Sequence, residues 1–192
     1  MTGDLRRLPP GHVGAVVTYL EMTEAPEPSG IADSLLRLER WDAVDPTAYR
    51  SLFRKVGGRW LWFSRLTMDD STLLANVAEV HSVLDPGNEK VGMLELDFRK
   101  RGECLIRFLG LVPRLAGRGH GRWLFDQTLK LAWREGIDRI RVNTCTLDHP
   151  AALPSYLRVG FTAYARAFES FPDPRQSGLL PSDVAPQVPL LG

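Results

Sequence analysis

Cysteine, net charge and long apolar runs are all scarce in this chain of 192 residues. Its two cysteines, Cys104 and Cys145, make no disulfide framework, so we expect a reducing, cytoplasmic setting. The first ten residues, MTGDLRRLPP, lack an apolar stretch, so we expect no secretory signal. No uncharged apolar run approaches the ~18 residues of a membrane-spanning helix. We therefore expect no membrane partner.

The charge balance excludes a general nucleic-acid binder. Lys plus Arg number 24 and Asp plus Glu number 23, for a formal net charge of +1. The composition, 44% hydrophobic and 24% charged, is that of an ordinary globular domain with enough chain to bury a core. The four histidines show no metal-ligand spacing with one another or with the cysteines, and we expect no metal.

Proline and glycine mark the expected boundaries of the fold. The segment EAPEPSG, Glu24–Gly30, is predicted to be a loop. Residues 171–192 contain five prolines and no regular period. We therefore expect a single domain over residues 1–170, followed by an extended, Pro-rich C-terminal arm that lies partly on the domain surface.

The first part of the chain is predicted to be one strand followed by short helices. Val13–Thr23 is apolar and β-branched, which favours a strand. Ala32–Trp41 and Pro46–Val56 are predicted to be helices, the second with Asp45 as its N-cap. Asp69–Val77 is predicted to form a further helical turn or two.

The rest of the chain is predicted to alternate between strands and helices. Three strands joined by tight turns predict an antiparallel meander. An apolar stripe at helical spacing then predicts a helix that ends near Glu135 and Gly136. A strand, a short helix and a final strand come after it. These later elements are Ala78–Asp85, Lys90–Arg99, Glu103–Val112, Arg139–Cys145, Pro150–Val159 and Phe161–Ser170. The order predicts a mixed sheet with helices packed on it.

The segment GLVPRLAGRGHGRW, Gly110–Trp123, carries the clearest chemical signal. Here a strand leads into a glycine-rich loop and the loop into an amphipathic helix. Glycines at positions 117, 119 and 121 lack Cβ atoms and accept positive φ, so successive N–H groups can converge on one point. The following helix adds unpaired donors and the positive end of its dipole. The sequence therefore predicts a phosphate cradle.

Charge is segregated along the chain around this loop. Residues 99–122 hold seven basic side chains and one acid, whereas residues 66–98 hold seven acids and one base. The basic stretch favours a phosphate ligand. The acidic stretch suits a cationic amine, which we take as a hypothesis for a second substrate.

Two common phosphate loops match the pattern poorly. A Walker loop needs Gly-Lys-Ser/Thr after its glycines, where this chain has Arg122-Trp123. A dinucleotide-binding Rossmann loop needs G-x-G-x-x-G inside a parallel β-α-β unit, whereas the spacing here is G-x-G-x-G after an expected antiparallel strand.

The loop instead resembles motif A of the GNAT N-acetyltransferase superfamily, (Q/R)-x-x-G-x-(G/A). The match runs through Arg114, Gly117 and Gly119, with the frequent further glycine at Gly121, and departs at Ala116, where arginine is usual. This resemblance implies the fold class α/β (α+β). It implies a central mixed, mostly antiparallel sheet of about six to seven strands, flanked by helices and with a splayed strand pair for CoA.

A second motif lies at the distance expected in that family. HPAALPSYLRVGF resembles N-x-x-A-x-x-x-Y-x-x-x-G-F, with matches that include Ala152, Tyr156 and Gly160. His149 replaces the usual asparagine, and Pro154 is unusual inside a short helix. The resemblance covers residues 78–170 well and residues 13–68 only by element order.

The resemblance implies an acyl-CoA-dependent N-acyltransferase that moves acetyl from acetyl-CoA to a primary amine by direct attack. The acceptor is expected to be a small-molecule or peptide amine. The pyrophosphate and the pantetheine arm are expected to lie on one set of residues. These are Leu111, Val112, Arg114, Gly117, Arg118, Gly119, His120, Gly121 and His149.

Two residues are predicted to move protons. Tyr156 matches the family position of the acid that protonates the departing thiolate, and a phenol pKa near ~10 is close to that of a thiol. Glu95 is predicted to be the base that takes the amine proton, directly or through a water, if its face of the strand lines the acceptor cleft. A backbone N–H near Leu111 is expected to stabilise the developing oxyanion.

Several alternatives stay open at the level of sequence. Trp60, Trp62 and Phe63 line an acceptor pocket or pack in the core, and Cys145 is expected to be buried and inert. A CoA-binding or sensing module without turnover would keep the same fold. A Rossmann-type nucleotide-binding protein is the more distant alternative. A homodimer through the C-terminal strand or arm is also compatible with the sequence.

Overall fold

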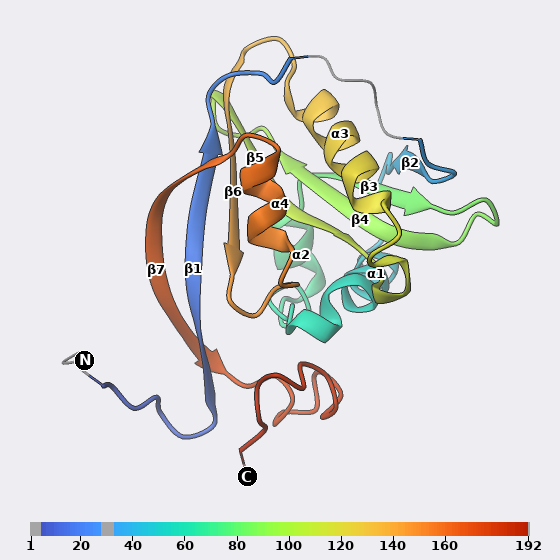
Figure 1. Ribbon diagram of the computed structural model, residues 1–192. Helices are drawn as coiled ribbons and strands as arrows, with labels where there is room; N and C mark the ends of the chain where they lie inside the picture. Colours follow the sequence, from blue (N-terminus) through green and yellow to red (C-terminus); the bar gives the residue numbers. More distant parts are fainter. Residues whose placement is uncertain (1–4, 28–32, 192) are drawn as a thin grey trace.

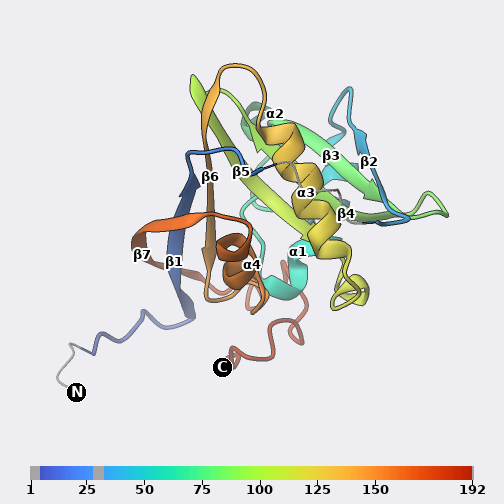
Figure 2. The same ribbon diagram turned by 45° about the horizontal axis from the view of Figure 1, so that its top comes forward.

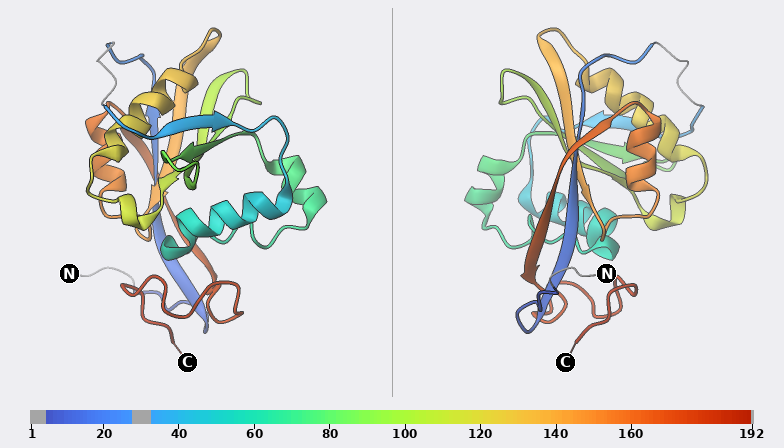
Figure 3. Two further views of the ribbon diagram at one scale, coloured as in Figure 1. Left: turned by 90° about the vertical axis from the view of Figure 1, so that its right-hand side faces the viewer. Right: turned by 60° about the vertical axis from the view of Figure 1, so that its left-hand side comes forward.

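The computed structural model describes residues 5–27 and 33–191. Figure 1 shows a twisted sheet with helices on both faces. Helices α3 (His120–Ala132) and α4 (Ala152–Arg158) cover one face, and α1 (Pro46–Gly57) and α2 (Asp70–Asn76) lie on the other, as Figure 3 shows. Of the predicted loop Glu24–Gly30, residues 28–30 lie outside the described part of the chain.

The sheet has seven strands in the order β2-β3-β4-β5-β6-β1-β7. All neighbouring strands are antiparallel except β5 and β6, which run parallel. The prediction of a mixed, mostly antiparallel sheet flanked by helices is therefore confirmed. The strands are β1 (His12–Met22), β2 (Arg37–Arg40), β3 (Glu79–Leu84), β4 (Lys90–Asp97), β5 (Gly102–Leu111), β6 (Ile137–Cys145) and β7 (Thr162–Pro172).

The predicted helix Ala32–Trp41 is wrong. Residue 32 is outside the described part of the chain, and Arg37–Arg40 forms the edge strand β2, which pairs antiparallel with β3. Leu36 is buried and Leu38 half-buried while Leu35 is 81% exposed, so the burial alternates as in a strand. Leucine, arginine and glutamate favour helix in isolation, but pairing with β3 overrides that preference.

The parallel strands β5 and β6 separate partway along their length. They pair from Gly102 to Ile106 on β5, and the last partner on β6 is Val142. The next residue, Arg107, is an extra residue opposite the step from Glu95 to Leu96 on β4, which makes it a β-bulge. Because a bulge bends its strand, β5 leaves β6 at this point, and the two strands diverge toward α4 in Figure 2.

The helix α1 begins and ends where the sequence predicts. The side chain of Asp45 accepts a hydrogen bond from the backbone N–H of Ala48 (2.6 Å), and Pro46 occupies the first turn. The helix ends at Gly57, where a Cβ atom would lie 2.1 Å from the Trp62 ring. This absence of a side chain lets Trp62 pack directly on the end of α1.

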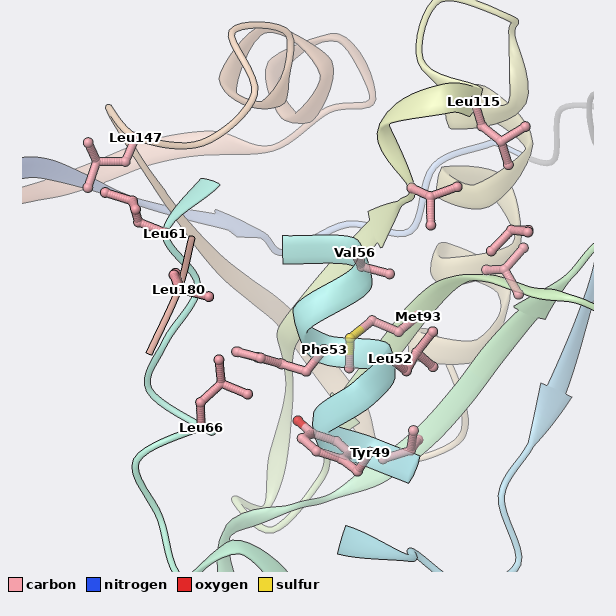
Figure 4. Packing of buried hydrophobic residues seen from close by; sticks show 14 of the residues in the cluster. Tyr49, Leu52, Phe53, Val56, Leu61, Leu66, Met93, Leu115, Leu147 and Leu180 are labelled. Carbon is pink, nitrogen blue, oxygen red and sulfur yellow. The ribbon is translucent and has the colours of Figure 1, made fainter. Parts of the chain in front are cut away.

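The core has two parts, one on each face of the sheet. Leu94, Leu96 and Ile140 pack under α3 and α4, and Tyr49 and Phe53 of α1 pack with Met93 of β4 on the other face. Figure 4 shows the α1 side, where Leu61 and Leu66 from the segment after α1 lie beside Leu180 from the C-terminal arm.

The C-terminal arm packs on the part of the core that lies beside α1. Leu180 and Ala185 are buried, and Arg175 is 5% exposed. Arg175 pairs with Asp173 (2.7 Å) and donates to the carbonyls of Val184 (3.0 Å) and Val188 (2.8 Å). One buried guanidinium thereby holds the coil that closes this end of the molecule.

Candidate active site

A cavity of about 900 Å³ opens where β5 and β6 diverge. Its walls include residues 105–111 of β5, the next residue Val112, and residues 142–145 of β6. Tyr156 on α4 also lines it. Val112 donates its N–H to the carbonyl of Val91 (2.8 Å). Because bonding alternates along an antiparallel strand, the N–H and C=O of Leu111 point away from β4 toward this cavity. The predicted splayed strand pair is therefore present and lines a hollow.

The glycine loop lies at one end of the cavity. Gly117 and Gly119 have φ of +72° and +82°, which is the left-handed region, and α3 begins directly after Gly119. A Cβ atom built on Gly117, Gly119 or Gly121 would meet no protein atom within 4 Å. Gly117 and Gly121 line the cavity. The loop is therefore open on the side of the helix N-terminus, whose first N–H groups lack intrahelical acceptors.

The basic side chains of the loop differ in their surroundings. Arg114 is bound by Glu89 (2.7 Å) on the turn between β3 and β4. Nδ1 of His120 lies 3.1 Å from the hydroxyl oxygen of Ser34. Arg118 is exposed and, within the described residues, has no carboxylate at ion-pair distance. None of these three side chains lines the cavity, so their contacts with phosphate stay predictions.

The charge segregation of the sequence largely cancels in three dimensions. Asp97 on β4 binds both Arg99 (2.6 Å) and Arg107 (2.7 Å), and these hydrogen bonds, those from Arg99 first, hold the pKa of that carboxyl well below its usual range. Other carboxylates of the acidic stretch are also paired; Glu79, for example, binds Arg134 (3.3 Å). The hypothesis of a free acidic surface for a cationic amine is therefore not supported by this arrangement.

Tyr156 lies in the cavity wall with its ring held by aromatic neighbours. The ring is 7% exposed and meets Phe125 and Phe161 edge-on, with centroids 5.1 and 5.6 Å away. Within the described residues, no protein group hydrogen-bonds the Tyr156 hydroxyl. Burial, and then the charge of Asp148, raise the pKa of the phenol above its usual value, so it is protonated at neutral pH.

The turn after β6 is organised by Asp148. Its carboxylate accepts hydrogen bonds from Trp62 Nε1 (3.1 Å), Thr144 Oγ1 (2.7 Å) and the N–H of Cys145 (2.9 Å). Nδ1 of the neighbouring His149 accepts a hydrogen bond from the N–H of Ala151 (3.0 Å), and His149 lines the cavity. His149 thus fixes the backbone at the start of α4 and also lines the cavity.

The aromatic cluster after α1 forms the opposite wall. Trp60, Trp62 and Phe63 all line the cavity, and Trp62 also packs against Phe53 in the core (5.5 Å between centroids). Core packing is therefore confirmed for Trp62, whereas an acceptor pocket formed by this cluster stays a prediction. Cys145 also reaches the wall, and burial, followed by Asp148, raises the pKa of its thiol to about 11, so the thiol stays protonated.

Glu95 is buried beneath the cavity and does not line it. Its carboxylate accepts hydrogen bonds from the Tyr49 hydroxyl (2.5 Å), Arg65 Nη2 (2.9 Å) and the N–H of Ala78 (3.2 Å). Arg65 does line the cavity, stacked over Phe108. The carboxylate predicted to be a base is thus held by three donors, one of which is a cavity residue.

The cavity residues that were not assigned a site role from the sequence include Arg65, Asn143, Asp148 and Glu169. Glu169 is exposed on β7, where it lies opposite Ala15 of β1. The sequence held one usable signal, the position of Asp148 just after a strand and before His149. Asn143 and Glu169 reach the cavity through the pairing of distant strands, and Arg65 reaches it from the segment after α1, where it contacts Glu95.

Neither a metal cluster nor a membrane-spanning helix is present in the described residues. No group of three or more His, Cys, Asp or Glu residues able to hold a metal occurs in that part of the chain. Among residues 5–27 and 33–191, no helix has the length and hydropathy needed to cross a membrane.

Comparison with known proteins identifies the family. The sequence profile of the acetyltransferase (GNAT) family matches residues 33–161, which is more than half of the chain. The chain therefore belongs to the GNAT family of acyltransferases, and the resemblance in its two motifs is confirmed. The Rossmann alternative is wrong, because five of the six strand pairings in the described sheet are antiparallel and only β5 and β6 run parallel there. A search of curated proteins finds no match.

Solved structures share this fold at low sequence identity. A GCN5-related N-acetyltransferase from Sphaerobacter thermophilus has a TM-score of 0.60 and 14% identity, covering 82% of this chain and 51% of that one. An acetyltransferase of the GNAT family from Novosphingobium aromaticivorans has a TM-score of 0.58 and 15% identity, with coverage of 86% and 68%. The chain thus spans about half the length of the Sphaerobacter protein.

A third structure belongs to a much longer protein. It is the glucosamine N-acetyltransferase region of a fungal multi-domain β-N-acetylglucosaminidase, with a TM-score of 0.56 and 14% identity, covering 81% of this chain and 20% of that one. At such identities these likenesses establish the fold alone.

Proposed function

We propose that this chain transfers an acyl group, in the first instance acetyl from acetyl-CoA, to a primary amine of a small molecule or peptide by direct attack. The observation that carries the proposal is the cavity between β5 and β6. A glycine loop lies at one end of it, and a buried phenol with no hydrogen-bond partner in the described protein lies in its wall. Membership of the GNAT family supports the same reaction class.

The residues at the loop fit a CoA pyrophosphate. Three glycines leave open space where side chains would otherwise stand, and α3 begins within this glycine stretch, so the positive end of a helix lies beside that space. The exposed guanidinium of Arg118 adds a positive charge nearby. Leu111 presents backbone donor and acceptor groups toward the cavity, which suits the amides of a pantetheine arm lying as an added strand.

The chain's own groups account for the proton transfers. Acetyl-CoA supplies an activated thioester. The backbone N–H of Leu111 points into the cavity, as the predicted oxyanion donor must. Tyr156 keeps its proton on the hydroxyl at neutral pH and delivers it to the departing sulfur.

Two carboxylates are candidates for taking the acceptor's proton. Glu95 is our predicted base, and its contact with Arg65 lets it act only through that cavity residue or a water that reaches it. Glu169 lines the cavity directly and is exposed to solvent. Geometry therefore favours Glu169 for direct proton removal and Glu95 for positioning Arg65.

The second candidate function is a CoA-binding or sensing module without turnover. The departures from the family pattern at Ala116, His149 and Pro154 favour it. Release of free CoA thiol from acetyl-CoA, followed with a thiol reagent over a panel of primary amines, tests the proposal. Amine-dependent release supports the enzyme, and acetyl-CoA binding without release by any amine supports the sensing module.

Two further proposals concern the setting of the protein. Both cysteines are free thiols, which supports a reducing, cytoplasmic location. β7 is the last strand of the described sheet and pairs only with β1 there, so its outer edge offers a surface for the predicted homodimer.

A further inference from the structure

A second cavity, of about 620 Å³, lies beside the first on the sheet. The two cavities share the wall residues Leu105, Arg107, Val142 and Asn143. A molecule whose amine lies in the first cavity can therefore extend into the second without leaving the protein surface. A role for the second cavity in binding the acceptor rests on the proposed function.

The second cavity is basic. Its ionisable wall residues are Arg99, Lys100, Arg107 and Arg141 against Asp97 and Glu103, a net formal charge of +2. We call it the basic cavity. Each of its two acids already serves two cations: Asp97 binds Arg99 and Arg107, and Glu103 binds Lys100 (2.6 Å) and Arg141 (3.3 Å). The two carboxylates therefore do not neutralise all four cations, and the excess positive charge suits an anionic ligand.

Arg141 on β6 has the least satisfied guanidinium of this group. It lies 3.3 Å from Glu103 and 3.7 Å from Glu21, and Glu21 is shared with Arg139 (3.4 Å). Its Nε atom is buried without a hydrogen-bond partner in the described residues. This Nε faces Glu21 at 3.7 Å, which is beyond hydrogen-bond distance, so the carboxylates around Arg141 leave part of its donor capacity unsatisfied.

Two β-bulges turn side chains into the basic cavity. Arg107 is the extra residue of β5 opposite β4, and Tyr164 is the extra residue of β7 opposite the step from Tyr19 to Leu20 on β1. Both line the basic cavity. The rings of Tyr19 and Tyr164 are 6.2 Å apart, and Arg141 lies over the Tyr164 ring at 5.4 Å. Bulges redirect side chains beside active sites, and here two of them converge on one hollow.

We propose that the basic cavity is the recognition subsite of the acceptor and binds a carboxylate on the acceptor through Arg141 and Arg107. The acceptor class is thus a small amine that also carries a carboxylate. Guanidinium groups bind carboxylates by paired, charge-assisted hydrogen bonds. The tyrosine rings and the Leu105 and Val142 side chains offer apolar surface for the rest of the molecule.

Matched acceptor pairs test this assignment. Acetyl transfer is measured to L-phenylalanine and L-phenylalaninamide, and to 4-aminobutyrate and 4-aminobutyramide, each differing only in the carboxylate. We expect kcat/KM to favour the acid of at least one pair by about tenfold or more, because hydrogen bonds between charged groups are the strong ones. The Arg141→Gln variant should lower that preference about tenfold, mainly through KM. Equal use of acid and amide in both pairs overturns the proposal.

Arg139→Gln is the matched control. Arg139 lies on the same strand and pairs with the same Glu21, but it does not line the basic cavity. We expect this variant to keep the wild-type preference for the acid. An equal loss of preference in both variants would show a general charge effect and overturn the assignment to Arg141.

Direct binding separates failure of this inference from failure of the proposed function. N-acetyl-L-phenylalanine and its amide, the products of one pair, are titrated into the whole protein by calorimetry. If no amine is acetylated but the acid binds, and Arg141→Gln abolishes that binding, the subsite stands without the transferase. If amines are acetylated, but acid and amide are used equally and neither Arg141→Gln nor Arg139→Gln changes kcat/KM, the transferase stands and the subsite is overturned.

Discussion

Replacing Tyr156 by phenylalanine separates the chemistry of the site from its architecture. The ring packs between Phe125 and Phe161 and is 7% exposed, so a phenylalanine ring fills the same space. The hydroxyl has no hydrogen-bond partner in the described protein, so its removal leaves no buried group unpaired. We therefore expect the free energy of unfolding to change by less than ~1 kcal/mol.

The rate of acetyl transfer should fall much further. A positioned general acid contributes about 10²–10⁴-fold to a rate, and the missing oxygen is the only heavy atom removed. The dissociation constant for acetyl-CoA should stay within about twofold of the wild type, since the phenol is assigned to the departing sulfur and not to binding. The expected signature is a lower kcat with binding and stability kept.

The pH dependence gives an independent check. Burial, then the Asp148 charge, raise the pKa of the Tyr156 phenol above the ordinary value of ~10. The acid form therefore persists well into the alkaline range. The wild-type kcat should show no alkaline decline between about pH 7 and 9 from loss of this proton.

Thiol release with a saturating amine, calorimetry with acetyl-CoA and thermal unfolding supply the three readouts. A Tyr156→Phe protein that keeps its full kcat would refute the assignment of the acid. A protein that loses acetyl-CoA binding to the same extent as rate would assign the hydroxyl to binding instead.

Substitutions at the loop, at the two candidate bases and at Asp97 test the rest of the geometry. Gly121→Ala should raise the free energy of unfolding by ~0.5–1 kcal/mol, because the added Cβ meets no protein atom and alanine favours the helix. The same variant should weaken acetyl-CoA binding on the order of tenfold. Unchanged binding would place the ligand away from the loop. Glu169→Gln should lower kcat with stability kept, whereas Glu95→Gln should cost ~3–5 kcal/mol of stability by leaving Arg65 buried without its carboxylate. The reverse pattern would restore Glu95 as the direct base. Asp97 has a lowered pKa in the folded state, so its ion pairs stabilise the fold above the unfolded-state pKa of ~3.9 and are lost progressively as the pH falls below it. Asp97→Asn should therefore make the free energy of unfolding depend less on pH in that range. An unchanged acid transition would contradict this.

Local sequence patterns predicted most of the elements because their boundaries carry strong chemistry. Asp45 and Pro46 begin α1, and Asp69 caps α2 by accepting from the N–H of Thr72 (2.7 Å). The helix wrongly predicted over residues 32–41 shows the limit of such patterns. Its residues favour helix individually, and only pairing with β3, some forty residues later in the chain, makes them a strand.

The candidate site divides in the same way. The loop glycines and Tyr156 belong to local motifs, and the structure brings both to one cavity. Arg65, Glu169 and Arg141 carry no motif, since Glu169 and Arg141 reach a cavity through pairing of distant strands and Arg65 through its contact with Glu95. Charge counts along the sequence were misleading for the same reason, because carboxylates of the acidic stretch pair with cations brought from several parts of the chain, such as Arg107 for Asp97 and Arg65 for Glu95.

Calorimetric titration of the purified protein with acetyl-CoA, with NADH as the control, tests the central claim most directly. We predict micromolar binding of acetyl-CoA and no heat from NADH, with the affinity for acetyl-CoA reduced in the Gly121→Ala protein. Binding of NADH without binding of acetyl-CoA would contradict the assignment of the cavity between β5 and β6 and every role derived from it.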